Sequence, residues 1–136
     1  MGLTSAVSYE NDAEDTTNAI CDAACTTARD IGASAIIALT KSGYTARRVS
    51  KFRPAQPIIA ATPDDKTFHQ LALSWGVYPV RALYQNEEDT LYRHAIDCAK
   101  MAGYVTPGDR VVLTAGASDM SSQANALRIQ LVENYR

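Results

Sequence analysis

Two short, uninterrupted apolar runs limit the fold of this chain more than any other feature. They are SAIIAL at residues 34–39 and PIIAAT at residues 57–62. A run of this length without polar alternation is typical of a strand that is buried on both faces, as in a parallel sheet. The segment between them, TARRVSKF at 45–52, has the pattern of a helix that Pro54 ends. The sequence therefore predicts a strand–helix–strand unit.

The same alternation continues along the chain, with short connections between the elements. Helices are predicted at 15–30, 45–52, 62–75 and 86–103, and strands at 34–39, 57–62, 77–83, 110–114 and 126–133. Thr62 is expected to cap the third helix. Pro79 predicts that the third strand lies at an edge of the sheet, because proline cannot donate to a strand ladder.

Two of the predicted helices carry a clear apolar stripe at helical spacing. The stripe is Ile20, Ala24, Ala28 and Ile31 in the leading helix, and Leu91, Ala95, Cys98 and Ala102 in the helix at 86–103. These are the faces that we expect to pack on the sheet.

The pattern as a whole predicts an α/β fold with three layers, α/β/α, around a mixed five-stranded sheet. Only a loop joins the last two strands, so the fifth strand is expected to run antiparallel to the fourth. A length of 136 residues is that of one domain. We expect residues 1–14 to form an N-terminal arm and residues 15–136 to form the domain.

Charge and cysteine content narrow the classes of function. The formal net charge of −2 gives no basic footprint for nucleic acid or a membrane surface, and no apolar stretch approaches the length of a membrane span. The three cysteines, Cys21, Cys25 and Cys98, have no framework spacing, which predicts reduced thiols in a cytoplasmic protein. The two histidines stand in unrelated segments, so we expect no metal site.

A polar loop follows the first predicted strand. Its residues are Thr40, Lys41, Ser42, Gly43, Tyr44 and Thr45. In open α/β sheets, ligands bind at the carboxyl ends of strands, and a helix N-terminus offers N–H groups and a partial positive charge to a phosphate. Two interpretations stay open: the loop binds a phosphate, or Ser42 or Thr40 only caps the helix that follows.

A long block of the sequence resembles the C-terminal α/β domain of pyruvate kinase. The block is AIIALTKSGYTARRVSKFRPAQPIIAATPDDKTFHQLALSWGVYPV at 35–80, with GDRVVLTAG at 108–116 and NAICDAACTTARDIGASAI at 18–36 in addition. The likeness extends over about residues 15–133. It implies the regulatory domain of that family, which also assembles the enzyme into oligomers.

The resemblance implies that the chain is not catalytic alone. The full enzyme converts phosphoenolpyruvate and ADP into pyruvate and ATP in glycolysis, and its magnesium and potassium ions belong to a barrel domain outside this chain. We therefore expect no cofactor here. The implied partners are a pyruvate kinase catalytic domain and further copies of the chain. The candidate assembly surface is the last strand, Ala126–Val132, which we expect at an edge of the sheet. The alternative is a protected edge strand that joins no second copy.

The same resemblance implies an effector site. Thr40 to Thr45 would hold the phosphate of a sugar phosphate or of AMP, and the loop after the fourth strand would form a second wall through Gly116, Ser118, Ser121 and Ser122. That loop reads ASDMSSQAN where the family usually has several glycines, which removes the backbone freedom for a tight wrap. We therefore expect a monophosphate ligand, or none, rather than a sugar bisphosphate.

Two alternatives to an effector domain remain. The first is a stand-alone domain that acts on or senses a small phosphorylated metabolite. It would need an acid or base beside the loop, such as Asp119 or Glu133. The second is a structural module in which the loop binds nothing.

Overall fold

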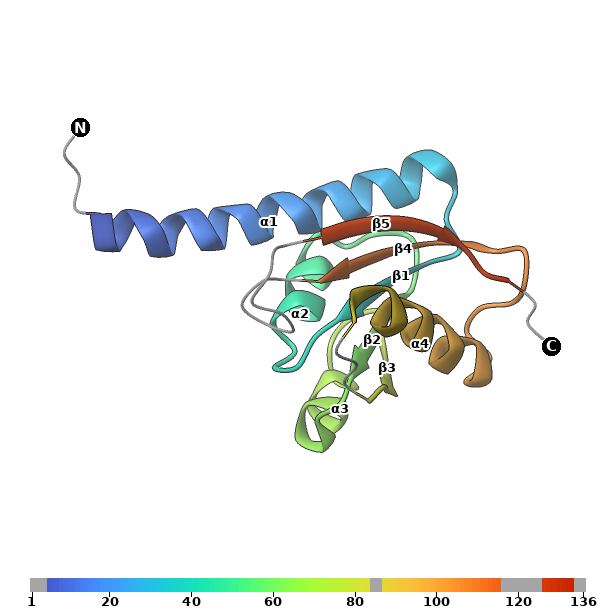
Figure 1. The fold of residues 1–136 in the computed structure, drawn as a ribbon. Helices are drawn as coiled ribbons and strands as arrows, with labels where there is room; N and C mark the ends of the chain where they lie inside the picture. The colour runs from blue at the N-terminus through green and yellow to red at the C-terminus, as the bar shows by residue number, and fades with distance from the viewer. Residues whose placement is uncertain (1–4, 84–86, 116–125, 134–136) are drawn as a thin grey trace.

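The computed structural model describes residues 5–83, 87–115 and 126–133, and its helices and strands follow one another in the predicted order (Figure 1). The helices are α1 (Ser5–Ile31), α2 (Tyr44–Lys51), α3 (Asp65–Leu71) and α4 (Glu88–Met101). The strands are β1 (Ala35–Leu39), β2 (Ile58–Thr62), β3 (Val77–Arg81), β4 (Arg110–Ala115) and β5 (Ala126–Leu131).

The five strands form one mixed sheet in the order β3-β2-β1-β4-β5. β1, β2, β3 and β4 are parallel, and β5 pairs antiparallel with β4, so that Leu131 lies opposite Arg110. The predicted fold class is therefore confirmed. Both expected edge strands, β3 with its Pro79 and β5, do lie at the edges of the sheet.

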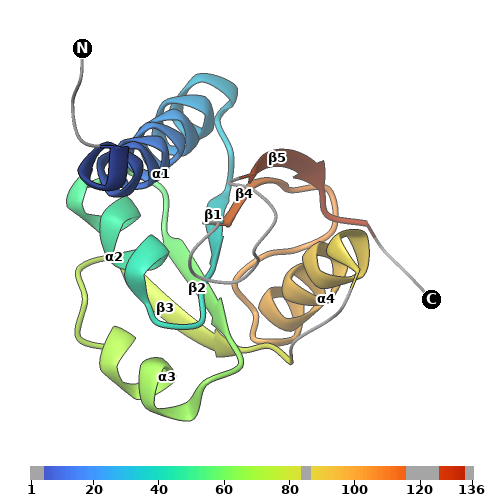
Figure 2. The same cartoon turned by 60° about the vertical axis from the view of Figure 1, so that its left-hand side comes forward.

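Helices cover both faces of the sheet. Figure 2 shows α1, α2 and α3 on one side and α4 on the other. Ala35, Ile37 and Leu39 of β1 belong to the apolar cluster under α4, while Ile36 and Ala38 belong to the cluster under the other three helices. Both faces of β1 are thus buried, which is why its sequence shows no polar alternation.

α1 begins at Ser5. This start lies inside the segment predicted as an arm and well before the predicted start of the helix at residue 15. Residues 5–14 contain no glycine or proline, so local propensity lets the helix continue although no apolar stripe marks it. In the part that packs on the sheet, Ala24 and Ala28 of the predicted stripe are fully buried, and so is Cys21. Ile20 and Ile31 of that stripe are only half-buried. In Figure 1 the N-terminal half of α1 extends past the sheet. The division at residue 15 falls inside this helix and stays a prediction.

The prediction that Thr62 caps α3 was wrong. The cap is Asp64, whose side chain accepts a hydrogen bond from the Thr67 N–H at 2.8 Å. Thr62 is instead the last residue of β2, and its hydroxyl accepts from the Asp64 N–H at 3.2 Å. A cap residue accepts from an N–H of the first helical turn, two or three residues later, and Asp64 does so at Thr67. The Thr62 hydroxyl accepts from Asp64, which precedes the helix.

α4 is rotated relative to its predicted stripe. Leu91 and Ala95 are buried as expected, but Tyr92, Ile96 and Ala99 complete the buried face. Cys98 is half-buried, and Ala102 is exposed beyond the end of the helix. Two stripes offset by one residue share the same spacing, so periodicity alone does not distinguish them.

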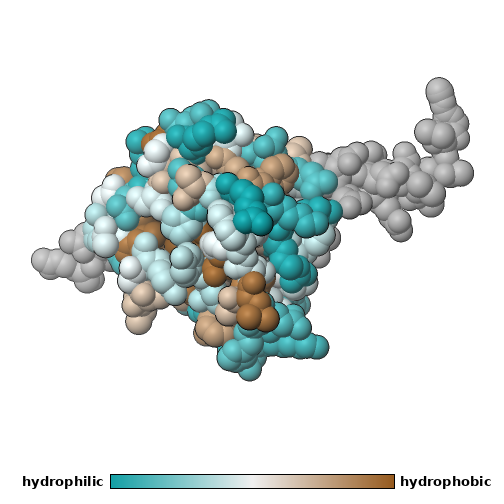
Figure 3. Space-filling view, turned by 180° about the vertical axis from the view of Figure 1, so that it is seen from behind, coloured by the Kyte–Doolittle hydropathy of each residue, from teal (hydrophilic) through white to brown (hydrophobic). Residues whose placement is uncertain are grey.

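The surface of the described residues carries both hydrophobic and hydrophilic side chains. Seen from behind, hydrophobic residues reach the surface as separate patches between hydrophilic ones (Figure 3). None of the helices in the described part of the chain is both long enough and apolar enough to cross a bilayer.

Candidate functional site

The loop after β1 lies where the order of the strands reverses. The chain passes from β1 to β2 and β3 on one side, and then returns to place β4 on the other side of β1. Leu39 and Ala115, the last residues of β1 and β4, lie opposite each other. In open α/β sheets the crevice at such a reversal, at the carboxyl ends of the strands, is the usual place for a ligand. Thr40 to Thr45 begin at this point.

The loop is folded by its own hydrogen bonds. The Gly43 N–H donates to the Thr40 hydroxyl at 2.7 Å, and the Tyr44 N–H donates to the Ser42 hydroxyl at 3.2 Å. The first helical bond of α2 follows, from the Arg47 N–H to the Gly43 carbonyl at 2.9 Å. Gly43 has φ +91°, which suits glycine and lets the chain turn from the strand into the helix. Gly43 occupies the cap position of α2 and no side chain caps it, so the alternative that Thr40 or Ser42 is the cap was wrong. Both hydroxyls instead accept an amide hydrogen inside the loop.

Accepting an amide hydrogen does not exclude a ligand. The bond uses a lone pair of the hydroxyl oxygen and not the hydroxyl hydrogen, so these two bonds do not by themselves rule out donation to a ligand. Lys41 and Ser42 are exposed, whereas Thr40 and Thr45 are buried and Tyr44 is half-buried. An anion approaching from solvent would therefore meet Lys41 and Ser42 first, at the start of α2. The assignment of Thr40, Gly43, Tyr44 and Thr45 to the same site stays a prediction.

Two arginines of α2 brace the loop. One guanidinium nitrogen of Arg47 donates to the Ser42 carbonyl at 3.4 Å. Arg48 donates through Nε to the Tyr44 hydroxyl at 3.1 Å, and its guanidinium carbon lies 5.2 Å from the centre of the Tyr44 ring. Both contacts bring positive charge to the end of the sheet where the loop lies.

A part of the loop's surroundings was not predicted from the sequence. The Thr67 hydroxyl, in the first turn of α3, donates to the Lys41 carbonyl at 2.9 Å. Leu71, one turn further along α3, lies beside Gly43, since a Cβ built on Gly43 would be 3.3 Å from Leu71 Cδ2. No local signal marks Thr67, because the contact joins residues 26 positions apart.

The second predicted wall of the site lies outside the described residues. This applies to Gly116, Ser118, Ser121 and Ser122, and to Asp119. The other acid proposed for a stand-alone enzyme, Glu133, is described and is far from the loop. It follows the end of β5, where Leu131 pairs with Arg110 at the start of β4, and so lies at the opposite end of the sheet from Thr40. Glu133 therefore cannot act as a base at this loop.

The cysteines that face α2 are unreactive in character. The Cys21 thiol lies 4.0 Å from the Thr45 carbonyl and the Cys25 thiol 3.9 Å from the Val49 carbonyl. Burial raises the pKa of Cys21 to about 12 and that of Cys25 to about 11. The Cys25 thiol adds to the first shift and Arg48 opposes it, while the Asp22 carboxylate adds to the second. Neither thiol offers a nucleophile at neutral pH. Within the described ranges, no three His, Cys, Asp or Glu side chains come together as a metal ion would require.

Comparison of this sequence with known proteins shows which family the chain belongs to. The family model for the pyruvate kinase alpha/beta domain matches residues 18–130. A pyruvate kinase of Clostridium acetobutylicum is 44% identical over 124 residues, which cover 90% of this chain and 26% of that protein. One from Lactobacillus delbrueckii subsp. bulgaricus is 40% identical over 119 residues, 87% of this chain and 20% of that protein.

A solved structure agrees with these relatives. The crystal structure of a pyruvate kinase from Cryptosporidium parvum superposes with a TM-score of 0.75 and 28% identity, covering 86% of this chain and 23% of that one. The chain therefore spans only between 20 and 26% of the length of the proteins that it matches. By its sequence and its fold, the chain belongs to the pyruvate kinase alpha/beta-domain family.

Proposed function

We propose that this chain is a regulatory and assembly domain that binds a phosphorylated small molecule at Thr40–Thr45 and acts with a pyruvate kinase catalytic domain. One observation carries the proposal: the loop lies at the reversal of strand order, with exposed Lys41 and Ser42 at the start of α2. Phosphoryl transfer from phosphoenolpyruvate to ADP, with its magnesium and potassium ions, belongs to the catalytic domain. The free thiols of Cys21, Cys25 and Cys98 support a cytoplasmic location.

The proposed ligand is a monophosphate ester. Lys41 contributes a cation, Ser42 a hydroxyl, and the first turn of α2 contributes N–H groups that have no acceptor within the helix. Hydrogen bonds to a charged oxygen contribute about 1.5–3 kcal/mol each, so a few of them suffice for a regulatory affinity. AMP and glucose 6-phosphate represent the two ester classes that the family resemblance implies.

Calorimetric titration with glucose 6-phosphate, AMP and inorganic phosphate tests this proposal. We expect the wild type to bind at least one ester, and Lys41→Ala/Ser42→Ala to weaken that binding at least about tenfold, since one charge and one donor are removed. The matched control is Ser34→Ala/Lys51→Ala, because both residues are exposed and lie at the opposite ends of β1 and α2. Equal binding by the two double variants would remove the loop from the proposal.

We also propose that β5 joins two copies of the chain edge to edge. The Val132 N–H donates to the Asp109 carbonyl, and the Val132 carbonyl accepts from the Gly108 N–H. Because the backbone groups of successive residues point to opposite sides of a strand, those of Ile129 and Leu131 point away from β4. The side chains of these two residues are half-exposed, at 50% and 52%. An unpaired edge with apolar side chains is a template for another strand. A pair of β5 strands related by a two-fold axis would extend the sheet across both copies.

A further inference from the structure

Helix α3 contacts the loop at two points, although it lies outside the loop in the sequence. The Thr67 hydroxyl donates to the Lys41 carbonyl at 2.9 Å, and Leu71 packs beside Gly43. Thr67 and Leu71 are four residues apart on a helix, so they share one face of α3. Both are buried. The conformation of the loop is therefore supported from α3 as well as from its own bonds.

We propose that Thr67 is a positioning residue of the loop at Thr40–Thr45: it fixes the Lys41–Ser42 peptide and, through it, the affinity for a phosphorylated ligand. The inference rests on the proposed function for its ligand, but its effect on the loop can be measured without one. Thr67 does not itself face the exposed side of the loop, since it is 5% exposed. It acts through the backbone of Lys41.

The physical basis is the planarity of the peptide bond. In a trans peptide the C=O of one residue and the N–H of the next point in opposite directions. With the Lys41 carbonyl held toward α3 by Thr67, the Ser42 N–H is directed away from α3. Lys41 and Ser42 are the exposed residues of the loop, so rotation of this peptide would change how both are presented to an anion.

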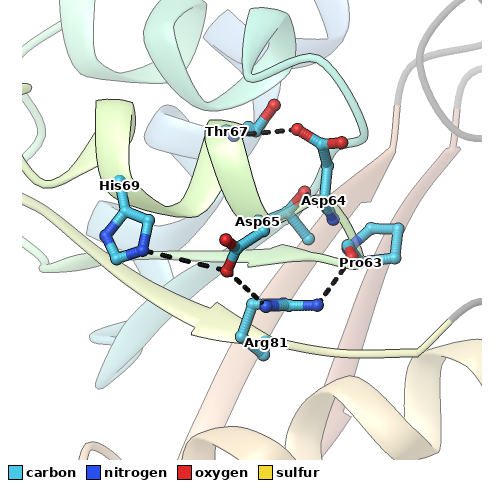
Figure 4. A network of polar contacts seen from close by, with 7 residues as sticks. Pro63, Asp64, Asp65, Thr67, His69 and Arg81 are labelled. Carbon is cyan, nitrogen blue, oxygen red and sulfur yellow. Dashed lines mark hydrogen bonds and ion pairs between the residues drawn. The ribbon is translucent and has the colours of Figure 1, made fainter.

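Thr67 can position the loop because hydrogen bonds fix the start of α3. The Thr67 N–H donates to the Asp64 carboxylate at 2.8 Å, and this hydrogen bond lowers the pKa of Asp64. Arg81 of β3 donates to the Asp65 carboxylate at 2.8 Å and to the Pro63 carbonyl at 3.0 Å, as Figure 4 shows. The start of α3 is thus fastened to the edge of the sheet, and Thr67 transfers that fixed position to Lys41.

Three variants separate positioning from general stability. Thr67→Val keeps the shape and burial of the side chain but removes the donor, and Thr67→Ser restores the donor. The control is Ser50→Ala, which removes another buried hydroxyl that donates to a carbonyl, that of Trp75 at 2.7 Å, away from the loop. Each variant is measured by denaturant unfolding, by hydrogen exchange of the amides at 42–45 without ligand, and by titration with glucose 6-phosphate and AMP.

We expect Thr67→Val to speed exchange of the Gly43 amide at least about fivefold and to weaken ester binding by a similar factor, as expected for loss of one hydrogen bond. Thr67→Ser should restore both, and Ser50→Ala should lower stability without either effect. Exchange at 42–45 that is the same in Thr67→Val and Ser50→Ala would overturn the inference, as would unchanged ester affinity in Thr67→Val. Faster exchange in a protein whose wild type binds no ester would support the positioning role and defeat the proposed ligand.

Discussion

At the scale of single residues, Gly43 decides how the chain leaves the central strand. It has φ +91° and precedes α2, and its amide is bonded to Thr40. A Cβ at this position would lie 2.5 Å from a terminal nitrogen of Arg47 and 3.3 Å from Leu71 Cδ2. The arginine end can move aside, but the buried leucine has less room. Both the backbone conformation and the packing therefore favour glycine.

We predict that Gly43→Ala lowers the free energy of unfolding more than a matched change elsewhere. The left-handed backbone alone costs about 1–2 kcal/mol for a residue with a Cβ. Gly103→Ala is the control, since Gly103 has φ +85° and open space around a Cβ. Urea unfolding of both variants separates the cost of the left-handed backbone from that of the contacts with Leu71 and Arg47. Equal losses in the two variants would mean that α3 does not press on the loop.

The buried thiols give a prediction for high pH. The pKa of Cys21 is raised by burial from 9.0 to about 12, so the folded state holds a proton that the unfolded state releases. The stabilisation is complete below pH 9 and declines as the pH rises toward 12. We therefore expect the free energy of unfolding to stay level below pH 9 and to fall between pH 9 and about 12, measured by denaturant unfolding. The fall should be smaller in Cys21→Ala/Cys25→Ala, and an equal fall in that variant would contradict the assignment.

The residues of the loop can be predicted from the sequence, but not all of its contacts can. Hydroxyls, a lysine and a glycine follow an apolar run, and this pattern indicates a loop at Thr40–Thr45. The sequence left open whether Thr40 or Ser42 is a cap, and the structure shows both accepting amide hydrogens within the loop. Thr67 was not identified, because a contact between separate elements depends on how α3 packs, which no local pattern encodes.

At the scale of elements, the two buried strands β1 and β2 were easier to predict than the ends of α1 and α3. β1 and β2 differ from their predicted ranges by one residue, because each apolar run is as long as the strand. Helix ends depend on which side chain reaches an amide and on local propensity. That is why Asp64 rather than Thr62 caps α3, and why α1 continues back to Ser5 without an apolar stripe.

The two edge strands differ in how they are protected. The Ile58 N–H donates to the Gly76 carbonyl, and the Ala82 N–H donates to the Thr62 carbonyl. The backbone N–H and C=O groups of the even-numbered residues of β3 therefore point toward β2, and the backbone of Pro79 points outward. A proline at that position removes a donor from the open edge without breaking the ladder. The described part of β5 contains no proline at its outward positions. Of the two edges, β5 is therefore the one suited to pairing.

At the scale of the whole molecule, a single strand separates the strand that carries the loop from the proposed assembly edge. β4 lies between β1, which carries the loop at Thr40–Thr45, and β5, the open edge. Leu39 pairs with Ala115, and Ala115 pairs with Ala126 at the start of β5. The carboxyl end of β1, where a ligand would bind, is therefore two strands away from the edge at which we propose that two copies meet. This adjacency allows a ligand at the loop to bias the assembly, provided that its affinity differs between the two states.

The assembly itself is tested by placing a proline at an outward position of β5, like Pro79 in β3. Ile129→Pro should remove an outward N–H while leaving the ladder to β4 intact, and Ile129→Val keeps that N–H as the matched control. We expect the wild type and Ile129→Val to form dimers in sedimentation equilibrium at tens of micromolar, and Ile129→Pro to be monomeric with unchanged circular dichroism. A monomeric wild type, or a dimer that persists in Ile129→Pro, would show that β5 does not join the copies. Because the loop residues are untouched, ester binding by a monomeric Ile129→Pro would further show that the site is complete within one chain, so that assembly tunes the affinity and does not create it.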